Sequence, residues 1–361
     1  MELKGHTAWV KFAVYTPDGK KIITAGMDDT ARIWSAETGE ELKKLEVRDG
    51  LLRASAFTPD RTKVAVTGSV ARLLNSELGE ELQVVQLSWL VDGASISPDG
   101  KKIVTTVSPL FDGPLFALLL DADTGRTSHR LVVRGISVFY GAFSPDSAKI
   151  VTRVNDNTAI IWDTESGNVL HTLTGHTEFI NTVSFSPDGT KVVTTSCGLT
   201  EETRRYVGTV YIWDVESGKE LHKLPELLGG VRDTVFSPDG KRIVTVNGTN
   251  GWAPSDARIW DVESGKELKT LALARDFIVF SPDGKQIVTG GEGHTAVIWD
   301  AESGRELQRL QGNPDSRASV GLYLISLASY DPKVSSVTFS PDGKKVVTAS
   351  NDGSVRIWTL E

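Results

Sequence analysis

Cysteine is almost absent from this sequence of 361 residues, which contains only Cys197. A single thiol cannot form an intrachain disulfide, and this is typical of proteins from a reducing compartment. No segment has the roughly 20 consecutive apolar residues that a membrane-spanning helix needs. The first residues, MELKGHTAWV, lack the basic and apolar regions of a signal peptide. We therefore expect a cytoplasmic protein.

An excess of positive charge is also missing. The chain has 39 Lys and Arg residues against 47 Asp and Glu residues, which gives a formal net charge of −8. Nucleic-acid binding normally requires a basic footprint, and attraction to anionic lipid requires clustered Lys or Arg. The charge balance therefore predicts neither nucleic acid nor a membrane as a partner.

Motifs of common active sites are absent as well. The sequence has no GxxxxGK[ST], GxSxG or HExxH pattern. The segment 121–125 looks like a fragment of a calcium loop, but the later ligands, including the final Glu, are missing. We therefore predict no enzyme activity, no catalytic residue, no cofactor and no metal.

A short turn motif, SPDG or a close variant, is what the sequence has in abundance. It recurs about every 40 to 60 residues, which with insertions is the period of four-stranded propeller blades. Its prolines define repeats 1 to 8 and are Pro17, Pro59, Pro98, Pro145, Pro187, Pro238, Pro282 and Pro341.

Each repeat reads as four short strands, which we name a to d. An apolar run precedes SPDG, a β-branched run such as KVVTTS (191–196) follows it, and an apolar triplet often ending in Trp precedes an ESGK-type turn. Pro and Gly suit tight turns, so each repeat predicts one antiparallel sheet. We predict an all-β, eight-bladed β-propeller of four-stranded antiparallel blades, as one domain over residues 1–361. The alternative is seven blades plus an irregular segment.

The chain resembles the WD-repeat family, in particular bacterial-type members. The family's Trp-Asp pair stands at residues 162–163, 213–214, 260–261 and 299–300, and its Gly-His pair at 5–6 and 175–176. The resemblance implies a β-propeller that binds proteins. It also implies a buried His–Thr–Asp–Trp network inside a blade, whose members we interpret as structural and not as a catalytic triad. The matching residues are His6, Thr24, Asp28 and Trp34 in repeat 1, His176, Thr194 and Trp213 in repeat 5, and Thr348, Asp352 and Trp358 in repeat 8.

The two ends of the chain match complementary parts of one repeat. Residues 2–6 resemble the end of a strand d, as in 170–176, and residues 356–361 resemble a strand c. The N-terminal strand is therefore expected to join the last blade, which removes an exposed sheet edge. We expect the closed ring to be monomeric.

The long insertions all fall on b–c or d–a connections, which lie at one end of every blade. They span residues 107–116, 196–207, 247–256 and 312–333. Long loops on a rigid scaffold often carry function, and aromatic and arginine side chains suit protein recognition. We predict that this face binds a protein or peptide through Phe111, Arg204, Arg205, Tyr206, Trp252, Tyr323 and Tyr330.

Two other functions remain open at this point. The chain could be a sensor or ligand-recognition domain excised from a larger signalling protein, because the WD propellers that it resembles are often fused to other modules. A propeller enzyme with its site at the channel mouth is the less favoured alternative, because no convergent set of acids or metal ligands is evident.

Overall fold

The computed structural model is built from β-strands, and the part that it describes contains no helix. The described residues are 1–46, 54–57, 63–67, 71–75, 81–85, 90–108, 115–133, 137–155, 157–199, 206–248, 256–272, 275–291, 295–312 and 334–360. They form eight four-stranded antiparallel sheets and one small three-stranded sheet. No helix that could cross a bilayer occurs among these residues.

One compact unit comprises Met1–Leu51 and Leu273–Glu361. It holds three of the four-stranded sheets. Their strands are β2 (Val10–Tyr15), β3 (Lys21–Gly26), β4 (Thr30–Ser35) and β5 (Glu41–Glu46); β29 (Arg275–Phe280), β30 (Gln286–Gly290), β31 (Thr295–Asp300) and β32 (Glu306–Gln311); and β33 (Val334–Phe339), β34 (Lys345–Ser350), β35 (Val355–Thr359) and β1 (Glu2–Leu3).

The second unit is Leu52–Ala272 and holds the other sheets. Its four-stranded sheets contain β6 (Ala54–Phe57), β7 (Lys63–Thr67), β8 (Ala71–Asn75) and β9 (Glu81–Val85); β10 (Leu90–Ile96), β11 (Lys102–Ser108), β12 (Phe116–Asp121) and β13 (Thr127–Leu131); β14 (Val138–Phe143), β15 (Lys149–Val154), β16 (Ala159–Asp163) and β17 (Val169–Leu173); β18 (Ile180–Phe185), β19 (Lys191–Ser196), β22 (Val210–Asp214) and β23 (Glu220–Lys223); and β25 (Val231–Phe236), β26 (Arg242–Asn247), β27 (Asp256–Asp261) and β28 (Glu267–Ala272). The small sheet contains β20 (Gly198–Leu199), β21 (Tyr206–Gly208) and β24 (Leu227–Leu228).

In the seven SPDG-type turns that the structure describes, the side chains of the motif close the turn between the first two strands of a sheet. In the turn between β33 and β34, Ser340 Oγ donates to Asp342 Oδ1 over 2.5 Å, and the Lys344 amide donates to the same oxygen over 3.1 Å. The hydrogen bond from Ser340 and the one from the Lys344 amide lower the pKa of Asp342. Gly343 has a φ of 70°, which a glycine adopts without strain. The motif therefore fixes the turn and, with it, the pairing of the two strands.

The Asp of the Trp-Asp pair closes the turn between the last two strands. Asp214 Oδ1 accepts hydrogen bonds from the Ser217 amide over 2.8 Å and from Ser217 Oγ over 2.5 Å. The Gly218 amide donates to the Asp214 carbonyl over 2.9 Å, with a φ of 68° at Gly218. This aspartate therefore serves turn geometry, whereas the Trp before it faces the core.

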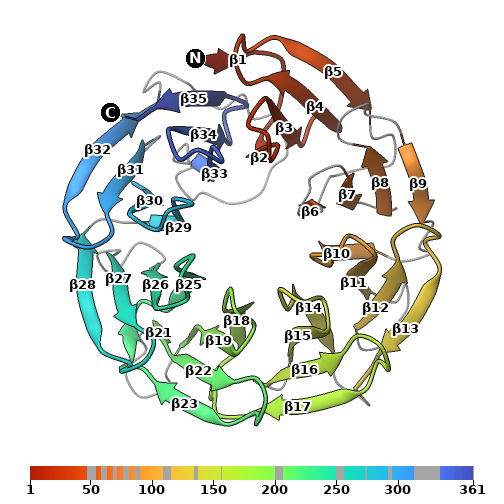
Figure 1. Cartoon of the computed structure of the whole chain (residues 1–361), viewed down its shortest axis with the longest axis vertical. Helices are drawn as coiled ribbons and strands as arrows, with labels where there is room; N and C mark the ends of the chain where they lie inside the picture. The colour runs from red at the N-terminus through yellow and green to blue at the C-terminus, as the bar shows by residue number, and fades with distance from the viewer. Residues whose placement is uncertain are drawn as a thin grey trace. The chain divides into compact units, whose positions relative to one another are not determined.

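The N-terminal strand β1 lies beside β35, near the other end of the chain (Figure 1). Glu2 pairs with Arg356 and Leu3 with Val355. The Met1 ammonium donates to the Ile357 carbonyl over 2.8 Å, and the Ile357 amide donates back to the Met1 carbonyl over 2.8 Å. The predicted pairing of the N-terminal strand with the last sheet is therefore confirmed.

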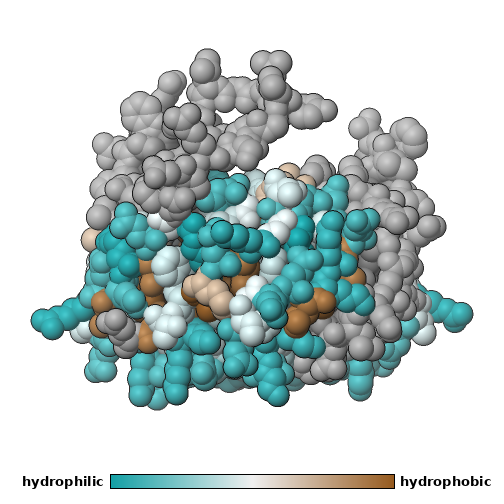
Figure 2. Space-filling model, turned by 90° about the horizontal axis from the view of Figure 1, so that it is seen from above, coloured by the Kyte–Doolittle hydropathy of each residue, from teal (hydrophilic) through white to brown (hydrophobic). Residues whose placement is uncertain are grey.

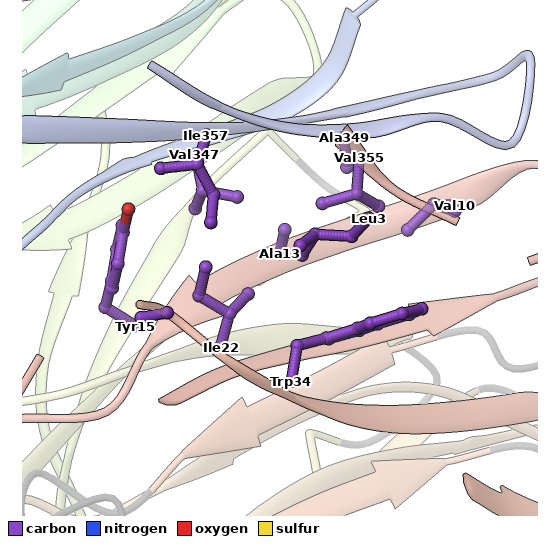
Figure 3. Close-up of a cluster of buried hydrophobic side chains, with 11 residues drawn as sticks. Leu3, Val10, Ala13, Tyr15, Ile22, Trp34, Val347, Ala349, Val355 and Ile357 are labelled. Carbon is purple, nitrogen blue, oxygen red and sulfur yellow. The ribbon is translucent and has the colours of Figure 1, made fainter. Parts of the chain in front are cut away.

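A buried apolar cluster joins this sheet to the sheet β2–β5. Leu3, Val355 and Ile357 contribute from one sheet, and Ile22 and Trp34 contribute from the other (Figure 3). In b strands such as β3 and β19, all residues after the first are buried. The β-branched residues of these strands therefore pack on both faces of the sheet, which explains their almost continuous apolar sequence.

Replacing Leu3 with alanine is expected to lower the free energy of unfolding by about 3 kcal/mol. Leu3 is 1% exposed and packs in the cluster of Figure 3, so the change removes buried methyl groups and leaves a cavity. Urea denaturation followed by tryptophan fluorescence measures the loss. Glu2→Ala, at the exposed neighbour, is the matched control and should change stability by less than about 0.5 kcal/mol. Equal effects of the two variants would show that β1 contributes no core.

The all-β class and the four-stranded antiparallel sheets are thus confirmed. The arrangement of these sheets as eight blades around one axis, and the single domain over residues 1–361, remain predictions.

Candidate functional site

The four network residues of repeat 1 lie in one chain of hydrogen bonds. Trp34 Nε1 donates to Thr24 Oγ1 over 2.8 Å, and Thr24 Oγ1 lies 2.7 Å from His6 Nε2. His6 Nδ1 lies 2.9 Å from Asp28 Oδ2. One arrangement of hydrogens satisfies every group: the indole donates to the hydroxyl, the hydroxyl donates to Nε2, and Nδ1–H donates to the carboxylate.

Burial argues against a catalytic role for this set. The side chains of His6 and Asp28 are 1% and 4% exposed, so no substrate can reach them. Burial lowers the pKa of His6 although the Asp28 carboxylate opposes this, and the imidazole is therefore neutral at pH 7. We interpret the set as a structural network that satisfies its own polar groups inside the sheet.

Repeat 5 contains the same series of hydrogen bonds, but the last residue of the series differs. Trp213 Nε1 donates to Thr194 Oγ1 over 2.8 Å, and Thr194 Oγ1 lies 2.7 Å from His176 Nε2. His176 Nδ1 lies 2.9 Å from Thr209 Oγ1, which in turn lies 2.7 Å from Ser196 Oγ. Thr209 thus takes the place that Asp28 has in repeat 1, and sequence reasoning missed it.

The sequence position of Thr209 could have identified it. Thr209 stands four residues before Trp213, as Thr30 stands four residues before Trp34, and Thr30 Oγ1 also lies 3.3 Å from His6 Nδ1. Because Thr209 is uncharged, it does not offset the desolvation of His176. Burial therefore lowers the pKa of His176 to about 4.

Repeat 8 keeps only part of the network. Trp358 Nε1 donates to Thr348 Oγ1 over 2.9 Å, and Asp352 Oδ1 accepts the Ser354 amide over 2.9 Å. Without a histidine, Asp352 serves the local turn. The structure therefore brings Thr348 and Trp358 together.

Tyr206 is the predicted partner-binding residue that the structure describes, and its side chain is 41% exposed. The other six lie outside the described residues: Phe111, Arg204, Arg205, Trp252, Tyr323 and Tyr330. The space-filling view shows hydrophobic side chains as small patches between hydrophilic ones (Figure 2).

The strands around Tyr206 lengthen the sheet of repeat 5, and we call β20, β21 and β24 the sheet extension. Leu199 pairs with Tyr206, and Val207 pairs with Leu228. The b–c connection thus continues strands β19 and β22, and the d–a connection continues β23. The sequence predicted a long loop here, but not that both of its ends would pair as strands.

Glycines allow close contacts at the base of the extension. A Cβ atom on Gly198 would collide with the Glu178 side chain, one on Gly208 with the Val231 amide nitrogen, and one on Gly230 with Cys197 Sγ. At Gly208 only glycine fits, because two backbones approach so closely there. The extension is therefore packed tightly against the neighbouring connections.

The exposed side chains of the extension lie on two different faces, because side chains alternate along a strand. Val193 and Ile212 pack in the core shared with the sheet β25–β28. Because side chains alternate along a strand, Leu199 and Tyr206 point to the same side as these residues. Leu228 pairs with Val207 and points to the opposite side. The extension thus exposes apolar side chains on both of its faces.

Arg232 lies near Cys197, at the base of the extension. Its side chain runs along Gly248, and its positive charge acts on Cys197, whose pKa is nevertheless raised by burial. Cys197 has the same strand parity as Leu199. We call the set of Cys197, Leu199, Tyr206 and Arg232 the Tyr206 surface.

A second aromatic group lies at the same end of the neighbouring sheets. The rings of Phe139 and Phe179 meet edge to face at 5.4 Å, and the Arg153 guanidinium lies 5.5 Å and 5.3 Å from their centres. Arg153 also donates to the Ile180 and Asn181 carbonyls. Phe179 is exposed and follows the Gly-His pair as Trp9 does in repeat 1. The equivalence of these two aromatics was the signal that could have identified Phe179.

Comparison with known proteins supports the repeat assignment. The family model "WD domain, G-beta repeat" matches residues 1–35, 167–200, 271–300 and 323–359. No group of three or more His, Cys, Asp or Glu side chains that could hold a metal ion occurs in the described part of the chain.

Relatives with curated names share part of the chain. Serine-threonine kinase receptor-associated protein of Gallus gallus is 25% identical over 44% of this chain and 44% of its own length. Small ribosomal subunit protein RACK1 of Schizosaccharomyces pombe is 30% identical over 30% of this chain and 36% of its own length. A ribosome biogenesis protein BOP1 homolog of Drosophila grimshawi is 30% identical over 29% of this chain and 14% of its own length. The chain thus spans less than half the length of each of these relatives.

The four family matches include repeats 1, 5 and 8, in which the network residues were found. Each matched segment contains the first two strands of a four-stranded antiparallel sheet and the SPDG-type turn between them. The chain is a WD-repeat protein.

Proposed function

We propose that this protein is an interaction scaffold, which binds a protein or peptide at the end of the sheets that carries the b–c and d–a connections. The observation that carries the proposal is the sheet extension of repeat 5. It exposes Leu199, Tyr206 and Leu228 by 49%, 41% and 58%, on short strands that pair with one another.

Exposed apolar side chains on a rigid support are suited to recognition. An ordered surface loses little conformational entropy when a partner binds, so more of the contact energy appears as affinity. Tyrosine is enriched among residues that dominate binding energy, because it combines a large apolar ring with a polar tip. Tyr206 and the neighbouring Phe179 therefore form the best-suited part of this end.

The names of the relatives point in the same direction. One is a receptor-associated protein and another a ribosomal subunit protein, so each is named for an assembly with other macromolecules. By this similarity we extend an interaction role to the present chain. The sensor-domain and enzyme alternatives have no comparable support from the described residues.

Site-specific crosslinking tests the proposal. A photoreactive phenylalanine analogue placed at Tyr206 is expected to crosslink to a discrete protein when the full chain is irradiated in its native cells. Leu221 on strand β23 is the matched control, because it is exposed to a similar extent, 42%, but lies on an outer edge strand. Crosslinking of the same protein at both positions, or at Leu221 alone, would contradict the proposal.

A further inference from the structure

We propose that strand β17 pairs edge to edge with the same strand of a second copy of this chain, so that the protein forms a weak antiparallel dimer. The outer strand of a sheet carries unpaired backbone N–H and C=O groups along one side, to which another strand can add. This surface is separate from the sheet extension, so its failure would leave the proposed function unaffected. The dimer replaces the monomer that the sequence predicted, because the pairing of the chain ends leaves the outer edges of the other sheets open.

Strand β17 is the last strand of its sheet, and within the described part of the chain it pairs with β16 alone. Figure 1 shows it on the outer side of β16. In the equivalent strand pair of repeat 5, the Leu224 amide donates to the Val210 carbonyl over 2.9 Å. Leu224 corresponds to Leu173, so the alternate residue Thr172 directs its amide and carbonyl away from β16. These two groups can pair with a further strand.

The sequence of β17, VLHTL, contains no Asp, Glu, Lys or Arg. Each of the outer strands β1, β5, β9, β13, β23, β28 and β32 contains at least one, such as Lys44 in β5, Arg130 in β13 and Lys269 in β28. In an antiparallel pair of identical strands, a charge near the middle lies close to its own copy, and like charges there are destabilising. Charged outer strands therefore oppose self-pairing, and β17 lacks this protection.

This contrast identifies a second copy as the occupant. A charge on an outer strand repels the same charge on an identical strand, but it does not repel a partner strand that is uncharged or oppositely charged. The absence of charge in β17 therefore matters most when β17 meets itself.

Apolar side chains at the start of β17 add to the contact. Val169 and Leu170 are 47% and 41% exposed. In repeats 1, 2, 5, 6 and 7, the residue equivalent to Val169 is a glutamate. Covering apolar side chains from water stabilises an interface. Because one strand per copy is a small contact, we expect a dissociation constant on the order of 10–100 μM.

Contacts with both neighbouring repeats hold β17 in place. The His129 ring lies against Gly167, which comes shortly before the strand. The His171 ring lies against Gly218, and its Nε2 donates to the Glu216 carbonyl over 2.9 Å. An ordered strand loses little conformational entropy when a second strand pairs with it. β17 is therefore a preformed template for pairing.

Sedimentation velocity of the full chain tests the proposal. Between about 1 μM and about 300 μM, the weight-average sedimentation coefficient is expected to rise and to fit a monomer–dimer equilibrium. Amide hydrogen exchange, followed by mass spectrometry at both concentrations, should be slower at residues 169–173 in the concentrated sample, because pairing protects the outward amides.

Two variants assign the dimer to β17. Leu170→Lys places a charge that meets its own copy, and it should raise the dissociation constant by about tenfold or more. Thr172→Pro removes an outward amide and should have the same effect, and Leu170→Lys alone decides if Thr172→Pro lowers the melting temperature. Leu221→Lys is the matched control, because Leu221 precedes His222 in β23 as Leu170 precedes His171, with a similar exposure of 42%. Its dissociation constant should stay within about twofold of the wild-type value.

Three results would overturn the proposal. One is a chain that sediments as a monomer at about 300 μM, even if β17 then accepts an extended segment of another protein. The others are a dimer that Leu170→Lys leaves unchanged and an equal loss of dimer in Leu170→Lys and Leu221→Lys, because the contact would then lie elsewhere.

Discussion

Replacing Trp34 with alanine is expected to destabilise the protein by about 4 kcal/mol. Trp34 is 1% exposed and belongs to the cluster that joins the first and last sheets of its unit (Figure 3). The substitution removes a large aromatic side chain and leaves Thr24 without the hydrogen bond that it accepts from the indole. Urea denaturation followed by circular dichroism measures the change, since this signal does not depend on the tryptophan that is lost.

Two milder variants separate packing from hydrogen bonding at the same place. Trp34→Phe keeps an aromatic ring in the cluster but removes the donor, whereas Thr24→Val keeps a similar volume but removes the hydroxyl between Trp34 and His6. Each should cost less than Trp34→Ala, with Thr24→Val costing about 1–3 kcal/mol because it interrupts a buried network. A loss below about 1 kcal/mol in Trp34→Ala would be incompatible with the core described above.

Acidification from pH 6.5 to pH 4 is expected to remove about 3 kcal/mol of stability through His176 alone. The pKa of His176 is about 4 in the folded protein because burial disfavours the imidazolium, whereas the unfolded chain has the ordinary value of 6.5. Between these values the unfolded state binds one more proton than the folded state, so stability rises with pH. The contribution of the neutral imidazole is therefore complete above about pH 6.5 and is lost as the pH falls towards 4.

Substitutions at two positions isolate this titration. His176→Gln removes the ionisable group and should flatten the dependence of stability on pH between 4 and 6.5. Thr209→Asp places a carboxylate next to His176 Nδ1, as Asp28 does for His6 from a different position in repeat 1. This carboxylate should raise the pKa of His176 and narrow the pH range in which stability is lost. Several turn aspartates, such as Asp342, have pKa values held below their ordinary range and titrate below this window. The account of His176 would fail if the wild type and His176→Gln lost stability in parallel.

The sequence allowed much of the fold to be predicted because its turns are specified locally. Each SPDG-type turn that the structure describes contains a serine or threonine that bonds to the aspartate, and a residue for the required backbone angle. The strand order within a sheet therefore follows from short-range chemistry. The pairing of Glu2 and Leu3 with the last strand is long-range, yet it was predictable because residues 2–6 repeat the pattern of residues 170–176. Periodicity thus substituted for knowledge of tertiary contacts.

The candidate site was less predictable because it arises where the repeat is broken. The insertion 196–207 lies outside the repeated pattern, so nothing in that pattern indicated that Tyr206 would pair with Leu199 or that Val207 would pair with Leu228. Thr209 was missed because the family pattern specifies an aspartate, although the spacing from Trp213 was available. Arg232 was missed because its place beside Cys197 depends on the packing of two adjacent sheets.

Hydrogen exchange with and without a bound partner tests the central claim most directly. The crosslinked partner is added to the full chain, and amide exchange is followed by mass spectrometry. We predict slower exchange at residues 196–208 and 227–232, with little change in strands β23 and β28. Protection confined to those outer strands, with the sheet extension unaffected, would contradict the account.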